Sequence, residues 1–254
     1  MNTNLIRLSL QKIFASILIL NSAHVFAAEQ YSTESTNDGV VAFNNGRYSD
    51  AEAYFLVKLK EPIYKNESLM YLSRIGMQKG DSDVAIKYIE QALAIEPNSV
   101  EELLLSGDIY CGQAQKSSIF TALKLAKTCI AQYDAAVNLA PENIDALVSA
   151  IKLHLNAPSI VGGSTKRGNE LLNHLSHLST EDADTIRLPL VEKEKGTDTA
   201  IALADEMSKK GFKSAENQYQ IAHYYKEKKL YAKAQPLFEP LLSWKETPKN
   251  RWFI

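Results

Sequence analysis

Apolar residues recur three and four positions apart along most of the chain, with polar residues between them. Leu69, Leu72 and Ile75 follow this spacing, and after a short polar break so do Ala85 and Ile89. Such spacing places apolar side chains on one face of an α-helix, whose period is about 3.6 residues. The pattern therefore predicts consecutive amphipathic helices, grouped in pairs, and an all-α fold.

The pairs repeat with a period of 34 residues. Gly46 and Ala51 are followed 34 positions later by Gly80 and Ala85, and a bulky residue stands four positions after each alanine. We place the starts of six units near residues 32, 66, 100, 144, 183 and 215. A fixed period of this length is typical of supersecondary units that stack on one another.

Helix-breaking residues punctuate the units. Pro62, Pro97 and Pro141 stand where one unit ends, because Pro lacks a backbone N–H and cannot continue a helix. Gly80 and Asp81 fall between the two helices of the second unit. Since Gly tolerates a positive φ, this dipeptide predicts a tight turn there.

These positions resemble the tetratricopeptide repeat, whose pattern is W-x2-L-G-x2-Y, then A-x3-F, then P. The second unit matches through Leu69, Ala85 and Pro97, and the third through Gly107 and Tyr110. The fourth and fifth units are assigned mostly by helical pattern. The resemblance implies a right-handed α-solenoid of about six helix-turn-helix units over residues 28–248, in which stacked units share one core. A single globular helical bundle is the alternative.

The first 27 residues have the layout of a secretory signal peptide. Arg7 and Lys12 are basic, residues 13–20 form an apolar run of eight, and VFA at 25–27 ends in a small residue. The run is too short to span a membrane, which takes about 20 residues. We expect cleavage between Ala27 and Ala28 and a periplasmic or otherwise exported protein. An uncleaved membrane anchor is the alternative.

Composition narrows the function classes. The chain has 254 residues, of which 45% are hydrophobic and 23% charged, as in ordinary globular proteins. Its formal net charge of −2 offers no basic field for nucleic acid. Two Cys are too few for a disulfide-rich scaffold or a four-cysteine zinc site.

Two segments depart from the repeat pattern. The third unit carries ten extra residues within 111–128, which we expect to add a helical turn or lengthen its second helix. The fourth unit contains a loop with Pro158 and the pair Gly162-Gly163, followed by Ser164 and Thr165. It lacks the spacing of a phosphate-binding loop, so Ser164 or Thr165 is expected to cap the next helix. Together the two segments could form a lip for a partner.

Cys111 ends the first helix of the third unit, and Cys129 lies inside the second. If the two helices run antiparallel, we expect Gly107 rather than Cys111 to face Cys129, which leaves the thiols about one helical turn, roughly 5 Å, out of register. An oxidising compartment favours a disulfide. The sequence leaves two alternatives, a Cys111–Cys129 disulfide or two small buried side chains.

Catalytic and metal-binding signatures are weak. His174 and His177 are three apart on one predicted helix, a spacing that can hold a metal, but no third ligand stands nearby. No Ser lies in a G-x-S-x-G motif. Acidic pairs such as Glu181-Asp182 begin helices, where they complement the helix dipole. We therefore expect no enzymatic activity, no cofactor and no metal site.

In the repeat family, the first helix of each unit lines a concave groove that holds a peptide or a partner helix. By spacing, the resemblance assigns this groove to nine residues: Met70, Arg74, Met77, Leu104, Asp108, Val148, Lys152, Tyr219 and His223. We expect a protein–protein interaction scaffold of the bacterial periplasm or cell envelope, with a peptide or protein partner. A ligand-binding accessory protein of a transport system is the alternative.

The C-terminal end resembles the beginning of another unit. Counting 34 residues from 215 places a seventh start at Lys249, and Trp252 then falls where the family carries its Trp. We expect residues 249–254 to be the start of an incomplete seventh unit. A natural end, with Trp252 and Phe253 covering the sixth unit, is the alternative.

Overall fold

The computed structural model describes residues 37–242, and every regular element in that range is a helix. The contacts group the chain into two compact bodies, one ending at Gly168 and the other beginning at Asn169. Within 37–242, no helix is both long and apolar enough to span a bilayer. The predicted all-α class is confirmed. The predicted signal peptide at 1–27 and the incomplete unit at 249–254 lie outside the described residues.

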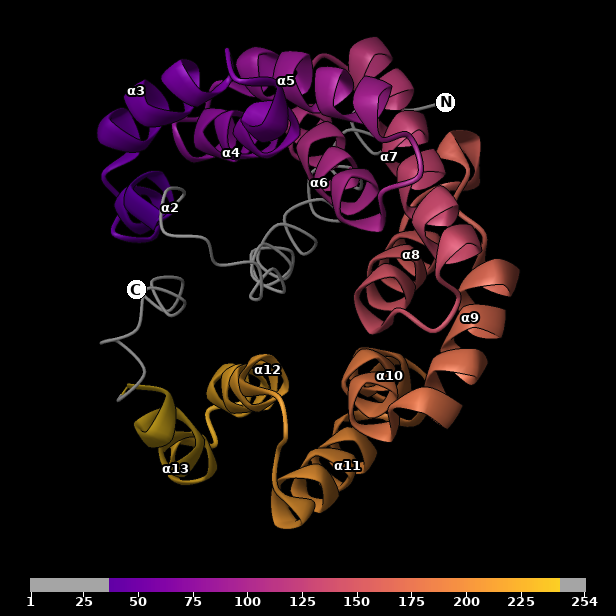
Figure 1. The fold of residues 1–254 in the computed structure, drawn as a ribbon. Helices are drawn as coiled ribbons and strands as arrows, with labels where there is room; N and C mark the ends of the chain where they lie inside the picture. Colours follow the sequence, from indigo (N-terminus) through magenta and orange to yellow (C-terminus); the bar gives the residue numbers. More distant parts are fainter. Residues whose placement is uncertain (1–36, 243–254) are drawn as a thin grey trace. The chain divides into compact units, whose positions relative to one another are not determined.

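The N-terminal body consists of helix pairs. Its elements are α2 (Asn37–Asn44), α3 (Tyr48–Lys58), η2 (Pro62–Tyr64), α4 (Lys65–Gln78), α5 (Ser82–Ile95), α6 (Val100–Lys116), α7 (Ile119–Leu139), α8 (Ile144–Asn156) and η3 (Ser159–Val161). Helix α9 (Thr165–Leu178) spans the boundary between the bodies. Helices α4, α6 and α8 follow one another along one side of the body, and α3, α5 and α7 along the other (Figure 1).

The C-terminal body continues the same organisation. It contains α10 (Thr180–Lys195), α11 (Thr197–Lys210), α12 (Ala215–Glu227) and α13 (Tyr231–Leu242). Helix α10 packs on α11, α12 packs on α13, and α10 also contacts α12. Ala200, Ala204, Ile221, Tyr225 and Ala234 form the centre of its core.

Short polar side chains fix where six of the described helices begin. Each accepts a hydrogen bond from a backbone N–H of the first turn, which would otherwise have no partner. The capping residues are Asp81, Ser99, Asn143, Ser164, Ser179 and Ser214, for α5, α6, α8, α9, α10 and α12 respectively. The predicted cap at Ser164 is therefore confirmed, and its Oγ lies 3.2 Å from the backbone N of Arg167.

Small residues set the distance between the helices of the second pair. Ala85 is fully buried, and a Cβ added at Gly76 would lie 2.9 Å from its backbone nitrogen. Gly80 adopts a φ of +76° in the turn, as predicted. In the α12–α13 turn, Lys229 takes the same left-handed conformation with a φ of 60°. Only this non-glycine residue has a positive φ within 37–242.

The ten-residue insertion lengthens both helices of the third pair. Helix α6 has 17 residues and α7 has 21, whereas α4 and α5 have 14 each. Only Ser117 and Ser118 separate α6 from α7. The inserted residues therefore extend the helical hairpin instead of forming a loop.

Candidate functional site

The inner helices α4, α6 and α8 of the N-terminal body form the surface where the repeat pattern predicts a groove. These helices contact their neighbours directly, α4 with α6 and α6 with α8. Figure 1 shows α4 and α6 on the side of the body away from α3 and α5. The side chains on this surface decide what it can bind.

Two polar contacts tie α4 to α6. Arg74 Nη2 donates to Glu101 Oε1 at 2.5 Å, and Asn66 Nδ2 donates to Glu102 Oε1 at 2.6 Å. The Arg74 side chain is 6% exposed, but that of Glu101 is 50% exposed. A charge-assisted bond of this kind holds one partner rigid and leaves the other accessible to solvent.

Glu102 is a buried carboxyl with an incomplete set of hydrogen bonds. Its side chain is among the most buried of the polar residues. Burial raises its pKa to about 7, and the nearby charges of Glu96 and Glu101 act in the same direction, while the bond from Asn66 opposes them. Glu102 Oε2 and Asn66 Oδ1 are both buried and have no hydrogen-bond partner in the described part of the chain.

The structure places the predicted groove residues of α4 and α6 at different depths. Met70 is buried and joins the core cluster of Leu69, Ala85 and Ile109, whereas Met77 is half-buried against the same cluster. Leu104 is buried, and Asp108 accepts a 2.5 Å hydrogen bond from the hydroxyl of Tyr133.

The remaining predicted residues divide between the two bodies. On α8, Val148 is buried and Lys152 is half-buried. Tyr219 and His223 lie on α12 in the C-terminal body, with ring centroids 5.9 Å apart. His223 Nδ1 lies 3.4 Å from Glu227 Oε1. The structure therefore brings seven of the nine together in one body, and the other two side by side in the second.

The sequence did not predict a cluster of hydrogen bonds around the carboxylate of Glu181 in the C-terminal body. Glu181, in the first turn of α10, accepts from the backbone nitrogens of Lys213 and Ser214 at 3.0 and 3.2 Å. It also accepts from Asn217 Nδ2 at 3.2 Å, and the same amide donates to Asp182 at 2.7 Å. Glu181 was predicted only to complement its own helix dipole, yet it supplies an anion to the N-terminus of α12.

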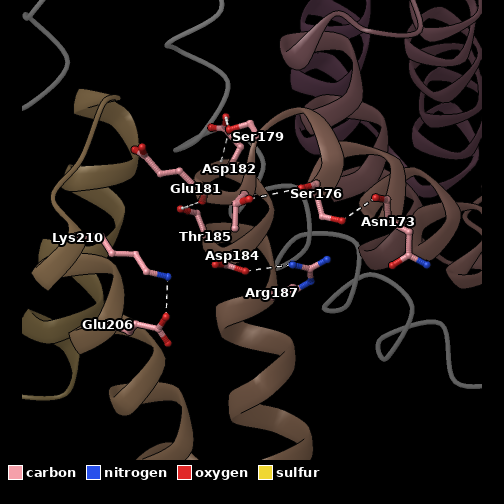
Figure 2. A network of polar contacts seen from close by, with 11 residues as sticks. Asn173, Ser176, Ser179, Glu181, Asp182, Asp184, Thr185, Arg187, Glu206 and Lys210 are labelled. Atoms are coloured by element: carbon pink, nitrogen blue, oxygen red, sulfur yellow. Dashed lines mark hydrogen bonds and ion pairs between the residues drawn. The ribbon is translucent and has the colours of Figure 1, made fainter.

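A pocket of about 600 Å³ lies beside Glu181 and Asp182. Its walls come from the first turns of α10, the end of α11 and the loop 211–214. Figure 2 shows two of its charged residues with their partners: Asp184 accepts from Arg187 at 3.0 Å, and Lys210 donates to Glu206 at 2.6 Å. The pocket thus carries both signs of charge.

The structure joins Cys111 to Cys129 in a disulfide, with their Cα atoms 5.4 Å apart. The predicted register of α6 on α7 was wrong. Gly107 does not face Cys129: a Cβ added to it would lie 2.4 Å from the ring of Tyr133. The close approach of the Tyr133 ring to Gly107 sets the register of α6 on α7. One helical turn further along α6, this register places Cys111 opposite Cys129.

His174 and His177 lie exposed on α9. Among the described residues, no group of three or more His, Cys, Asp and Glu has a geometry that would hold a metal ion. His154 on α8 is buried, and its Nε2 lies 3.0 Å from Asp134 Oδ1 on α7. We assign this pair to the packing of α8 on α7.

The comparisons with known proteins agree with the geometry. The sequence profile of the family described as "Tetratricopeptide repeat" matches residues 67–99, which cover α4, α5 and the turn between them. A solved structure with the same fold is TTC0263, a thermophilic TPR protein of Thermus thermophilus. The chain contains a segment that matches the tetratricopeptide repeat (TPR), and it has the fold of TPR proteins. TTC0263 is 16% identical to this TPR chain, with a TM-score of 0.55 over 73% of it and 94% of TTC0263.

Human IFIT1, solved as a dimer with m7Gppp-AAAA, also matches this TPR chain. The identity is 17% and the TM-score 0.59, over 84% of this chain and 54% of IFIT1. A monomeric IFIT1 mutant with Gppp-AAAA matches with 16% identity and a TM-score of 0.60. The TPR chain spans about half the length of these IFIT1 chains. At such identities the likeness concerns the fold alone. No curated protein sequence matches the TPR chain.

Proposed function

We propose that this TPR protein is an interaction scaffold of the bacterial periplasm or cell envelope. It binds a peptide or a partner protein along α4, α6 and α8. The observation that carries the proposal is the alignment of these three first helices in one body. A row of parallel first helices offers an extended surface on which charged groups such as Glu101 and Lys152 can contact a partner.

Two features support an exported setting. The basic residues and short apolar run at 1–27 have the layout of a signal peptide. Cys111 and Cys129 are buried and have the geometry of a disulfide, a bond that persists mainly in oxidising compartments. Amino-terminal sequencing of the protein isolated from its source tests this setting, and a mature chain that still begins at Met1 would contradict it.

The proposal assigns the chain no enzymatic activity and no cofactor. The polar clusters described above consist of side chains that hold helices together, as Glu181 holds the α11–α12 loop and Arg74 holds Glu101. This arrangement supports a structural rather than a catalytic use of these groups. Binding to a partner then depends on the shape and charge of the surface.

The test compares how much partner is captured by the unmodified chain and by a variant whose inner helices have lost two charges. In the double variant Glu101→Gln with Lys152→Gln, one acid and one base are lost from the inner helices. The matched control, Glu52→Gln with Lys87→Gln, removes one acid of α3 and one base of α5, and Glu52 is ion-paired with Lys79 as Glu101 is with Arg74. Cross-linking in the native envelope followed by mass spectrometry identifies the partner captured by the unmodified chain. The proposal predicts roughly ten-fold weaker capture for the inner variant only. Equal capture by both variants would contradict it.

A ligand-binding accessory protein remains the second candidate, favoured by the pocket at α10–α12. Its volume of about 600 Å³ lies in the range of small-molecule sites. Both charge signs at its wall suit a polar, zwitterionic molecule. Native mass spectrometry of protein purified from its source separates the two candidates. A small molecule bound one to one and lost on Asp184→Asn would favour the second.

A further inference from the structure

The α6–α7 hairpin extends beyond its contact with the fourth pair. Gly162, which follows η3, packs near Ile130: a Cβ added to Gly162 would lie 3.5 Å from Ile130 Cδ1. Helix α7 begins at Ile119, eleven residues before Ile130. At a rise of 1.5 Å per residue, about 16 Å of α7 lies on the N-terminal side of this contact. The end of the α6–α7 hairpin therefore lies beyond the part of α7 that contacts the fourth pair.

An aromatic side chain lies exposed at this end. Phe120 is 83% exposed, and it stands in the first turn of α7. In the loop after α8, Ile160 is 52% exposed. Single exposed apolar residues are common on protein surfaces and need no explanation by themselves. Phe120 differs from such single residues because the charged side chains near it are basic.

The hairpin end is entirely cationic. Lys116 ends α6, and Lys124 and Lys127 stand on α7; all three are exposed. Phe120, Lys124 and Lys127 are spaced four and three residues apart, so they lie along one face of the helix. No Asp or Glu occurs from residue 109 to residue 133. This local excess of three positive charges stands in a chain whose net charge is −2.

The adjoining connection of the fourth pair has the same sign. Lys166 and Arg167 begin α9 just after the loop, and no acid occurs from residue 146 to residue 169. Glu96 and Glu142 stand at the connections between pairs, before α6 and α8, whereas Glu170 stands on α9 one turn after Lys166. The turn of the third pair therefore carries basic residues and no acid over 109–133, whereas in the fourth pair an acid follows the basic residues within one turn.

We propose that this cationic end, formed by Lys116, Phe120, Lys124 and Lys127, docks on a membrane surface rich in anionic lipid. Lipid phosphates attract the Lys side chains, and the headgroup region accepts the ring of Phe120. The disulfide stands five residues before the end of α6 and keeps the extended hairpin closed. The inference goes beyond the scaffold function, since it concerns the ends of the helices and not the inner surface.

The probe is a lipid vesicle of phosphatidylcholine, with or without phosphatidylglycerol. Co-sedimentation of the full chain is compared between variants that share the same termini. Replacing Lys116, Lys124 and Lys127 together by Gln should reduce binding to the anionic vesicles on the order of 100-fold, since each Lys near the surface contributes about 1 kcal/mol, or roughly five-fold. Phe120→Ala should reduce it roughly ten-fold. Raising the salt concentration should release the unmodified chain.

Matched controls come from the first two pairs. Ile63 is 84% exposed, so Ile63→Ala removes a comparable apolar side chain. Lys60, Lys65 and Lys87 are exposed, and replacing them by Gln removes the same charge elsewhere. These controls should bind the anionic vesicles as the unmodified chain does.

Three results would overturn the proposal: equal binding to both vesicle types, equal losses in the control variants, or no binding to anionic vesicles. An acidic protein surface is the other occupant that this charge would fit. If the triple Lys variant loses a captured protein while its vesicle binding is unchanged, that occupant replaces the lipid. The Glu101→Gln, Lys152→Gln variant should keep vesicle binding, so failure of the scaffold function is seen separately.

Discussion

Replacing Glu102 by Gln should stabilise the folded chain at pH 8 and change its stability little near pH 5. In the structure, Asn66 donates to one oxygen of Glu102, and two acceptors, Glu102 Oε2 and Asn66 Oδ1, are left without partners in the described part of the chain. A proton on Glu102 Oε2 supplies the donor that these acceptors lack. The neutral acid therefore fits the site better than the carboxylate.

The magnitude and sign follow from linkage between protonation and folding. Burial raises the pKa of Glu102 from 4.5 to about 7 in the folded chain. The unfolded chain loses this proton near pH 4.5, whereas the folded chain keeps it until about pH 7. Between these values the unfolded state binds fewer protons, so the free energy of unfolding falls as the pH rises. Between pH 5 and pH 8 the loss amounts to about 2 kcal/mol.

The assay is urea unfolding followed by circular dichroism at pH 5 and pH 8. Gln cannot ionise, so Glu102→Gln should lack the loss and be more stable than the unmodified chain at pH 8 by about 2 kcal/mol. Glu142→Gln is the control, because Glu142 is exposed and its charge is not among those that act on the pKa of Glu102; it should show the same pH dependence as the unmodified chain. Hydrogen exchange of the α4 and α6 amides locates the effect.

An unchanged pH dependence in Glu102→Gln would refute the reasoning. It would mean that Glu102 is solvated when ionised, or that it already carries its proton in both states over this range. A destabilised Glu102→Gln at both pH values would show that the carboxylate, and not the acid, is the form that Asn66 stabilises.

Three further changes test other parts of the fold by thermal and urea unfolding. Lys229→Gly should stabilise the chain by about 0.5–1 kcal/mol, because the left-handed φ of 60° costs a residue with a Cβ more than it costs Gly; a loss would contradict it. Replacing Cys111 and Cys129 by Ser should cost about 3 kcal/mol, the loop-closure entropy for a separation of 18 residues, and reduction should leave the double variant unaffected. Ala85→Leu should cost about 1–3 kcal/mol by overpacking, and an unchanged melting temperature would argue against its tight contact.

The order of the helices could be predicted because its determinants are local. Apolar spacing selects the buried face of each helix, and Pro97 and Pro141 stop a helix wherever they stand. Gly80 and Asp81 form a turn and a cap through their own backbone and side chain. None of these effects needs a distant partner, so the pairs and the all-α class were predicted correctly from the residues.

Tertiary packing decided how the helices meet. The register of α6 on α7 depends on the ring of Tyr133 against Gly107, and that contact places Cys111 opposite Cys129. The sequence shows an insertion of fixed length, but not how its residues divide between the two helices. Antiparallel counting from the turn therefore missed the alignment by about one turn.

In the candidate site too, the sequence determined some features and tertiary packing decided others. Repeat spacing assigns Met70 to the inner surface, but its burial in a core cluster depends on how closely α6 lies against α4. Glu181 binds backbone groups 32 and 33 residues away, which no local pattern indicates. The sequence by itself determined which segments are helical and which face of each is apolar, because these depend on neighbours within one or two turns. Only the tertiary structure decided which polar groups meet, because a hydrogen bond requires positions within about 3 Å that are set by the packing of whole helices.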